Sequence, residues 1–188
     1  GAPAFNYQGL NAAGTWNLQR IFRDNLVGNL AADSTGDGSP DSLALLDKLH
    51  DRVLLKCDAR DGVRDGVIGD PLACDFNPSV DLSDLMCSSD TAGSDCFTTA
   101  QLQTINDLYN GPSDSSGRAV YPGKMFGSEL RWAGYYIPWQ GNGMGPSKLM
   151  GVAGDHMNYL FYEEDPGVTV PDVRDVTYQA DTEGVMPE

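Results

Sequence analysis

Residues 57–74 read Cys-Asp-Ala-Arg-Asp-Gly-Val-Arg-Asp-Gly-Val-Ile-Gly-Asp-Pro-Leu-Ala-Cys. Asp-Gly-Val occurs twice in this stretch, at 61–63 and at 65–67, and Asp58 precedes the first copy by three residues. Three carboxylates within eight residues repel one another unless a positive charge lies between them. Each glycine permits a turn or a positive φ, which folds the chain back so that carbonyl groups also point inward.

Calcium is the cation that such a loop suits, because it takes six to eight oxygen ligands. Side-chain oxygens would come from Asp58, Asp61 and Asp65, and backbone carbonyls from Val63 and Val67. The loop is not an EF-hand, because position 12 counted from Asp61 is a leucine where that motif needs glutamate. The alternative interpretation is a solvated acidic loop without an ion.

A second acidic run, residues 33–41, also lacks the glutamate at position 12, where Ala44 stands. We interpret it as a surface turn that leads into a helix.

The four cysteines, Cys57, Cys74, Cys87 and Cys96, allow three disulfide pairings. We favour the two local pairings, Cys57–Cys74 and Cys87–Cys96, because they close short loops. The spacings match no zinc or redox motif. An even number of cysteines in an acidic, lysine-poor chain predicts a secreted or periplasmic protein.

The composition limits the classes of partner. With 12 Lys and Arg against 27 Asp and Glu, the net charge of the 188 residues is −15. Nucleic-acid binding needs clustered basic residues, and docking to anionic membranes needs them too, so both are disfavoured. No apolar run is long enough to span a bilayer. A hydrophobic fraction of 40% is enough for a packed core.

Helical periodicity dominates the pattern of apolar residues. Leu45, Leu46, Leu49 and Val53 form one stripe, and Thr98 with Gln101 matches a capping box. The predicted helices span residues 11–24, 41–56, 99–110 and 146–162, and one short strand is predicted at 119–121. Helices and strands do not alternate, so we predict a helix-rich, loop-rich α+β unit and no complete doubly wound domain.

The stretch from Cys57 to Pro78 resembles the calcium-loop signature of the tannase and feruloyl esterase family, to which a bacterial terephthalate-monoester hydrolase also belongs. Further similar segments are Gly1-Ala2-Pro3-Ala4, Phe97-Thr98-x-x-Gln101, Tyr121-Pro122-Gly123 and Tyr159-Leu160-x-Tyr162-x-x-x-Pro166. The likeness covers most of the chain.

The resemblance implies an α/β-hydrolase core with a Ser-His-Asp triad and a large inserted lid. This chain would be the lid with short core flanks: an entry segment at 1–30, the calcium-binding lid at 31–165, and a return segment at 166–188. The resemblance also implies the calcium ligands and the two local disulfides named above. The partners would then be the catalytic core of the same parent protein and an aromatic ester.

A nucleophile is missing from the sequence. Neither G-x-S-x-G nor the Cys-Ser-x-Gly-Gly form of the family occurs. His50 lies on a predicted amphipathic helix and is interpreted as a surface or boundary residue. Asp155 and His156 are adjacent, which disfavours a catalytic dyad on a helix. We therefore predict that the 188 residues alone do not hydrolyse esters.

A lid shapes the substrate pocket, and aromatic walls suit aromatic acids. The candidates for such a wall are Trp132, Tyr135, Tyr136 and Trp139. The alternative interpretation, which the composition alone favours no less, is that these side chains form the core of the lid itself. We predict the lid of a secreted esterase for aromatic acids such as ferulate or gallate. The alternatives are a stand-alone calcium-stabilised binding module and a self-sufficient enzyme that uses His156.

Overall fold

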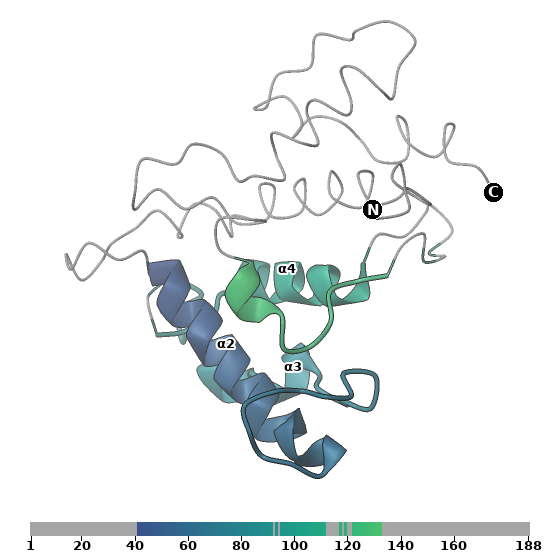
Figure 1. Ribbon diagram of the computed structural model, residues 1–188. Coiled ribbons are helices and arrows are strands. Elements are labelled where there is room, and N and C mark those ends of the chain that lie inside the picture. Colours follow the sequence, from purple (N-terminus) through teal and green to yellow (C-terminus); the bar gives the residue numbers. More distant parts are fainter. Residues whose placement is uncertain are drawn as a thin grey trace, which may run out of the picture.

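The computed structural model describes residues 41–91, 93, 95–111, 117, 119 and 122–132. In chain order the elements are α2 (Asp41–Cys57), η1 (Asp58–Asp61), α3 (Pro78–Asp81), η2 (Ser83–Leu85), α4 (Thr99–Asn110) and η3 (Glu129–Arg131). Helix η3 packs against α2, and α3 packs against α4 (Figure 1). The predicted helix-rich character is confirmed for this part of the chain. Among its residues, Met86 and Phe97 form an isolated parallel β-bridge.

Helix α2 forms because its apolar residues recur on one face. Leu45, Leu49, Val53 and Cys57 follow one another at intervals of four and are all at least 97% buried, and Leu46 widens the stripe. Burial of each such leucine stabilises the fold by about 1.5–3 kcal/mol. The helix predicted at 41–56 is therefore confirmed to within one residue.

Helix α4 begins and ends as predicted. The Thr98 hydroxyl accepts the Gln101 amide at 3.2 Å, and the Gln101 side chain accepts the Thr98 amide at 2.8 Å, which completes the capping box. The Asp90 carboxylate accepts a further amide, that of Thr99, at 2.6 Å. Gly111 ends the helix with a φ of +77°.

Helix α3 was not predicted, because four residues are too few for a periodic apolar pattern. Its signal is local: Pro78 occupies the first helical position, and the Asn77 side chain accepts the Ser79 amide at 3.0 Å. The predicted helices at 11–24 and 146–162 lie outside the described residues, as does the predicted strand at 119–121 apart from Ala119.

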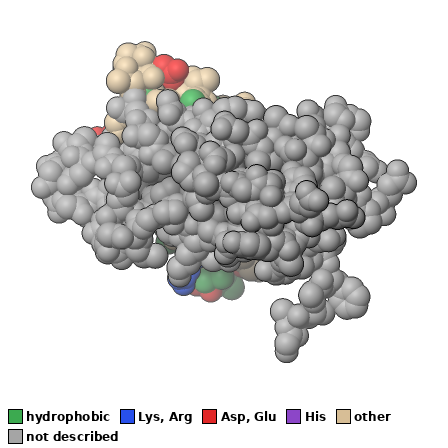
Figure 2. All heavy atoms as spheres, turned by 90° about the horizontal axis from the view of Figure 1, so that it is seen from above, with side chains coloured by type: hydrophobic (Ala, Val, Ile, Leu, Met, Phe, Trp, Pro, Cys, Tyr) green, Lys and Arg blue, Asp and Glu red, His purple; other side chains and the backbone are tan. Residues whose placement is uncertain are grey.

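The core joins α2 and α4 to residues of the intervening loops and to Trp132. It consists of Leu45, Leu46, Leu49, Val53, Cys57, Cys74, Phe76, Leu82, Phe97, Ile105, Leu108 and Trp132. None of the described helices has the length and apolar content needed to cross a membrane. In Figure 2, acidic and hydrophobic side chains of the described part both reach the edge of the face that is drawn.

A row of ion pairs runs along the outside of the first helices. Basic residues recur at every fourth position, and each contacts an aspartate of the later segment 75–95 in reverse order. The pairs are Lys48–Asp95, Arg52–Asp84, Lys56–Asp81 and Arg60–Asp75. Exposed pairs contribute little individually, about 0–1 kcal/mol each, but the row sets the direction in which this segment lies along α2.

Candidate functional site

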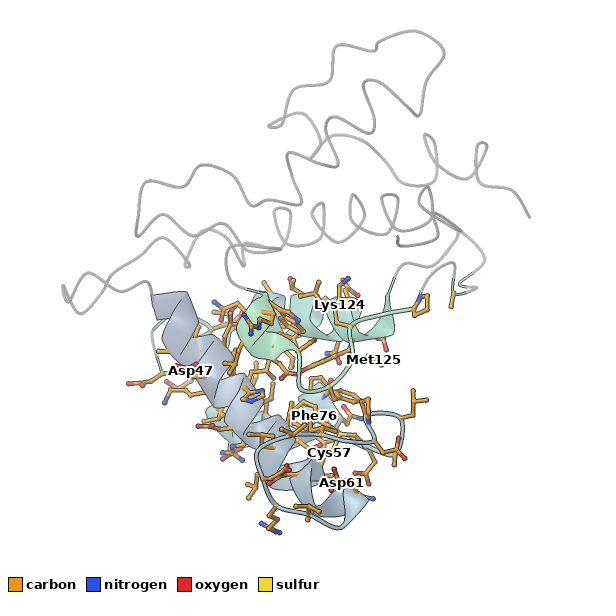
Figure 3. All side chains as sticks on the ribbon, in the orientation of Figure 1. Asp47, Cys57, Asp61, Phe76, Lys124 and Met125 are labelled. Atoms are coloured by element: carbon orange, nitrogen blue, oxygen red, sulfur yellow. A yellow bond between two sulfur atoms is a disulfide. The ribbon has the colours of Figure 1, made fainter. Side chains whose placement is uncertain are left out.

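The acidic loop begins where α2 ends. Cys57 is the last residue of α2, Asp58–Asp61 continues as the 3-10 helix η1, and the chain then turns back to Cys74. The Cys57–Cys74 disulfide closes the base of the loop, with a Cα–Cα distance of 5.3 Å. Figure 3 shows Cys57 and Asp61 at this C-terminal end of α2. The loop is therefore attached to the core at both ends, because Cys57 and Cys74 both belong to the buried cluster.

The three predicted ligand carboxylates bind backbone amides of their own loop. One oxygen of Asp58 accepts the amides of Asp65 and Gly66, at 3.3 and 3.0 Å. Asp61 accepts Val63 with one oxygen and Gly69 with the other, both at 2.9 Å. These hydrogen bonds fold the loop back so that its backbone amides point toward its own aspartates.

Asp65 repeats the short-range pattern of Asp61. Its carboxylate accepts the Val67 amide at 3.0 Å, two residues ahead, as Asp61 accepts that of Val63. Gly62 and Gly66 follow the two aspartates with φ of +97° and +79°, values that residues with a Cβ rarely adopt. The repeated Asp-Gly-Val therefore produces two successive turns of the same kind.

The hydrogen bonds within the loop favour the ionised form of Asp61. The amides of Val63 and Gly69 lower the pKa of Asp61, because they donate to its charged form. Hard carboxylate oxygens are the donors that calcium prefers. The positions of the carboxylates do not match this preference. In the part of the chain that the structure describes, no three His, Cys, Asp or Glu side chains form a group that could hold a metal ion. The donor chemistry thus suits calcium, while the side chains do not converge.

Both disulfides match the favoured pairing. Cys57 is bonded to Cys74, and Cys87 to Cys96, whose Cα atoms lie 4.9 Å apart. The second disulfide closes the loop that also carries Asp90, whose carboxylate accepts the Thr99 amide in the first turn of α4. The pairing predicted from loop length is confirmed.

Trp132 is a core residue. Its side chain is only 1% exposed, its ring lies 5.3 Å from that of Tyr109, and its indole N–H donates to the Ser128 hydroxyl at 3.1 Å. A ring buried in this way offers no surface to a substrate, so its assignment to a substrate wall is corrected here. The other wall candidates, Tyr135, Tyr136 and Trp139, lie outside the described residues, as do His156 and the acidic run at 33–40.

A buried carboxylate that the sequence analysis missed joins three segments. Glu129 is completely buried, and one of its oxygens lies 2.7 Å from His50 Nδ1 of α2. The other oxygen accepts the Tyr109 hydroxyl of α4 at 2.7 Å and the Gly127 amide at 2.8 Å. The sequence holds no signal for this role, because Glu129 stands alone between a serine and a leucine.

Tyr109 remains a hydrogen-bond donor in this network. Burial raises the pKa of its hydroxyl far above the ordinary value, and the negative charge of Glu129 beside it adds to the shift.

His50 has 14% of its side chain exposed, so its interpretation as a boundary residue of the helix is confirmed.

The turn before Glu129 also contacts the acidic loop. Gly127 has a φ of +94°, and Ile68 lies in ordinary van der Waals contact with the position that a Cβ would take there. Phe126 in the same turn stacks edge-on against Phe76, with ring centroids 5.8 Å apart. The acidic loop and the segment 122–132 therefore share one packed boundary.

Comparison with known proteins gives consistent matches. Residues 1–167 match the family model described as tannase and feruloyl esterase. A probable feruloyl esterase B-1 of Aspergillus oryzae is 32% identical over 72% of this chain and 23% of its own length. A probable feruloyl esterase B of Emericella nidulans is 30% identical over 69% of this chain and 22% of its own. The chain thus spans less than a quarter of the length of these relatives.

A solved structure shares the fold. The crystal structure of feruloyl esterase B from Aspergillus oryzae is similar with a TM-score of 0.59 at 24% identity, over 92% of this chain and 31% of that one.

Proposed function

The chain belongs to the tannase and feruloyl esterase family, and on this premise we propose that it is part of a secreted carboxylic ester hydrolase for esters of aromatic acids such as ferulate or gallate. The observation that carries the proposal is the family match over residues 1–167, together with relatives that are named as feruloyl esterases. Two disulfides in the described part support an oxidising compartment such as the cell exterior or the periplasm.

Within that enzyme, we propose that the chain forms the lid. Its entry segment would be residues 1–30, its body residues 31–165, and its return segment residues 166–188. Acyl transfer by a serine needs a nucleophile, a histidine and an acid in one constellation. Because the nucleophile motifs are absent from these 188 residues, the Ser-His-Asp triad would come from the catalytic core of the same parent protein. The lid would exclude water and shape the substrate pocket.

We also propose that the acidic loop binds one calcium ion. The support is the repeated Asp-Gly-Val pattern, with donors from Asp58, Asp61 and Asp65 and from the carbonyls of Val63 and Val67. One oxygen of Asp58 and one of Asp65 make no hydrogen bond within the described residues, so they are available to an ion. The proposal requires the three carboxylates to draw closer together than they are here. Calorimetric titration of the metal-free protein with Ca²⁺ tests it, and absence of binding at millimolar calcium would remove it.

Hydrolysis assays test the enzymatic proposal. The parent protein is expected to release ferulate from methyl ferulate or gallate from methyl gallate, whereas the isolated 188 residues are expected to release neither. Hydrolysis of an aliphatic ester with no turnover of either aromatic ester would contradict the substrate class. Turnover by the isolated chain would contradict the lid assignment.

The same assays separate the alternative functions. A stand-alone binding module predicts that the isolated chain folds, binds an aromatic ligand and has no part in hydrolysis. A self-sufficient enzyme predicts turnover by the isolated chain that is lost in His156→Ala.

A further inference from the structure

The two disulfides differ in how deeply they are buried. Cys57 is 1% exposed and Cys74 is 9% exposed, and both belong to the core. Cys87 and Cys96 are only half-buried, and the loop between them is exposed at residues 88–91. Thiol–disulfide exchange requires a thiolate to reach one of the two sulfur atoms, so access controls its rate. A dissolved reductant should therefore attack Cys87–Cys96 well before Cys57–Cys74.

The surroundings of Cys96 also favour attack at this disulfide. A Cβ on Gly93 would stand 3.9 Å from the Cys96 sulfur, so this neighbour contributes no side chain that could cover the sulfur. Asp95 is adjacent to Cys96 and pairs with Lys48, whose ammonium lies 3.3 Å from the carboxylate. The lysine offsets a negative charge that would otherwise repel an approaching thiolate.

Backbone hydrogen bonds join the two ends of this loop independently of the disulfide. The Cys87 amide donates to the Phe97 carbonyl at 2.9 Å, and the Phe97 amide donates to the Leu85 carbonyl at 2.8 Å. Phe97 is also a core residue, with only 2% of its surface exposed. These contacts should hold the base of the loop in place after the sulfur–sulfur bond breaks. The effect of reduction is then confined to the rest of the loop and to what it contacts.

Asp90 connects the loop to α4. Its carboxylate accepts the amide of Thr99 at 2.6 Å, and Thr99 is the first residue of the helix, where amides have no partner within the helix. A negative charge at this end also interacts favourably with the helix dipole. Asp90 reaches this position with a φ of +52°, which is uncommon for residues other than glycine. Such a conformation persists where the surrounding structure imposes it, and here the Asp90 amide donates to the Cys87 carbonyl at 3.2 Å.

We propose that the Cys87–Cys96 disulfide is a redox-sensitive lock on the start of α4. When it is closed, it keeps the Asp90 carboxylate on the Thr99 amide. When a dithiol reductant opens it, that contact is released while Cys57–Cys74 stays intact. The proposal goes beyond ester hydrolysis and does not depend on it.

The opening reaction is a thiol–disulfide exchange in two steps. A thiolate of the dithiol attacks one sulfur of the pair, which forms a mixed disulfide and releases the other cysteine as a thiolate. The second thiol of the reagent then displaces the remaining cysteine, so that the reagent ends as a cyclic disulfide. Two electrons and two protons pass from the dithiol to the protein, and Cys87 and Cys96 end as thiols.

The order of reduction is tested on the native parent protein with dithiothreitol at neutral pH. Samples are alkylated at intervals, and mass spectrometry of the peptides gives the reduced fraction of each pair. We expect Cys87 and Cys96 to react at least about tenfold faster than Cys57 and Cys74. In denaturant, where both pairs are accessible, this difference should disappear. Equal rates in the native protein would overturn the proposal, as would a difference that persists in denaturant.

Amide hydrogen exchange tests the link to α4. In protein reduced only at Cys87–Cys96, exchange in the peptide 97–102 should become about threefold faster or more, and exchange at the end of the helix should not change. Asp90→Ala should show the faster exchange already in the oxidised state and respond little to reduction. Asp95→Ala is the matched control, because it removes an aspartate of the same loop that pairs with α2. It should respond to reduction as wild type does.

Two results of the exchange measurement would contradict the lock. One is an unchanged start of α4 after reduction, and the other is a full response to reduction in Asp90→Ala. Because wild-type protein is reduced directly, neither result depends on whether a cysteine variant folds.

Discussion

Gly123 lies against the backbone carbonyl of Tyr109 so closely that a Cβ on Gly123 would stand 1.8 Å from the carbonyl oxygen. The same Cβ would stand 2.7 Å from the Gly111 nitrogen, at the end of α4. The segment 122–132 can therefore cross the end of this helix only because residue 123 has no side chain. The close approach is what allows the neighbouring Lys124 amide to reach the Leu108 carbonyl.

Substitution Gly123→Ala should destabilise the protein by about 3 kcal/mol or more, because the clash is with backbone and the whole segment must shift. Chemical denaturation measures the change in the free energy of unfolding. Gly93→Ala is the control, because a Cβ there would meet only the Cys96 sulfur at 3.9 Å. Equal stability of the two variants would contradict the close crossing.

Calcium should stabilise the folded protein. A ligand that binds only the native state at a hundred times its Kd contributes about 2.7 kcal/mol, so chelation should lower Tm by several degrees. Asp61→Asn should abolish the dependence of Tm on calcium, because it removes a central charged donor. A chelator-sensitive Tm that persists in Asp61→Asn would place the ion elsewhere.

Gly69→Ala offers a gentler probe of the same loop. A Cβ at residue 69 would stand 2.4 Å from Asp61 Oδ2, so the carboxylate must turn away and lose its bond to the Gly69 amide. The charge is kept but its position changes. We expect weaker calcium binding by roughly tenfold with little loss of stability in the metal-free state, measured by calorimetric titration. Unchanged affinity would show that Asp61 is not a ligand.

Stability should fall in acid through the aspartates that pair with α2. Burial alone would raise the pKa of Asp81, but the Asn77 amide and Lys56 outweigh it and hold that pKa below the ordinary value. The hydrogen bond from Arg52 likewise lowers the pKa of Asp84. The unfolded chain therefore binds more protons than the folded one below about pH 4, where an ordinary aspartate titrates.

The sign of this linkage makes the contribution present above about pH 4 and lost as the pH falls further, through the folded pKa values. Urea midpoints measured between pH 7 and pH 2.5 check it. Asp81→Asn should lose less stability than wild type over the acid range, and Lys56→Gln should give an intermediate result because the Asn77 bond remains. An identical acid loss in Asp81→Asn and wild type would count against the assignment.

Removal of either disulfide should lower stability. The Cys57–Cys74 bridge closes 17 residues and the Cys87–Cys96 bridge closes 9, which by loop entropy corresponds to roughly 3 and 2.5 kcal/mol. The paired substitutions Cys57→Ala/Cys74→Ala and Cys87→Ala/Cys96→Ala, compared by chemical denaturation, measure both values. The first pair should cost more, because Cys57 also belongs to the core; the reverse order would contradict this.

Local patterns were the predictable part of the fold. The helices at 41–57 and 99–110 follow from apolar spacing and capping residues, which act within a few positions of one another. The disulfide pairing followed from short loops for the same reason. The four-residue helix α3 was not predicted, because a single turn shows no periodicity.

The candidate site was predictable only in its composition. The loop residues Asp58, Asp61 and Asp65 were identified from their spacing, but the sequence did not indicate that each would bind backbone amides of the loop. Trp132 illustrates the same limit, because an aromatic residue among others can equally line a pocket or fill a core. Its burial beside Tyr109 decided between the two.

The sequence by itself determined the two long helices, the acidic loop between paired cysteines and the membership of an esterase family, because these depend on residues close together in the chain or on motifs. Only the tertiary structure decided that His50, Tyr109 and Glu129 meet, across separations of 20 and 79 residues. It also decided that Gly123 must pass the end of α4 without a side chain. Such contacts arise from how buried segments pack in space. A lone glutamate or glycine in the sequence does not indicate which distant residue it will contact.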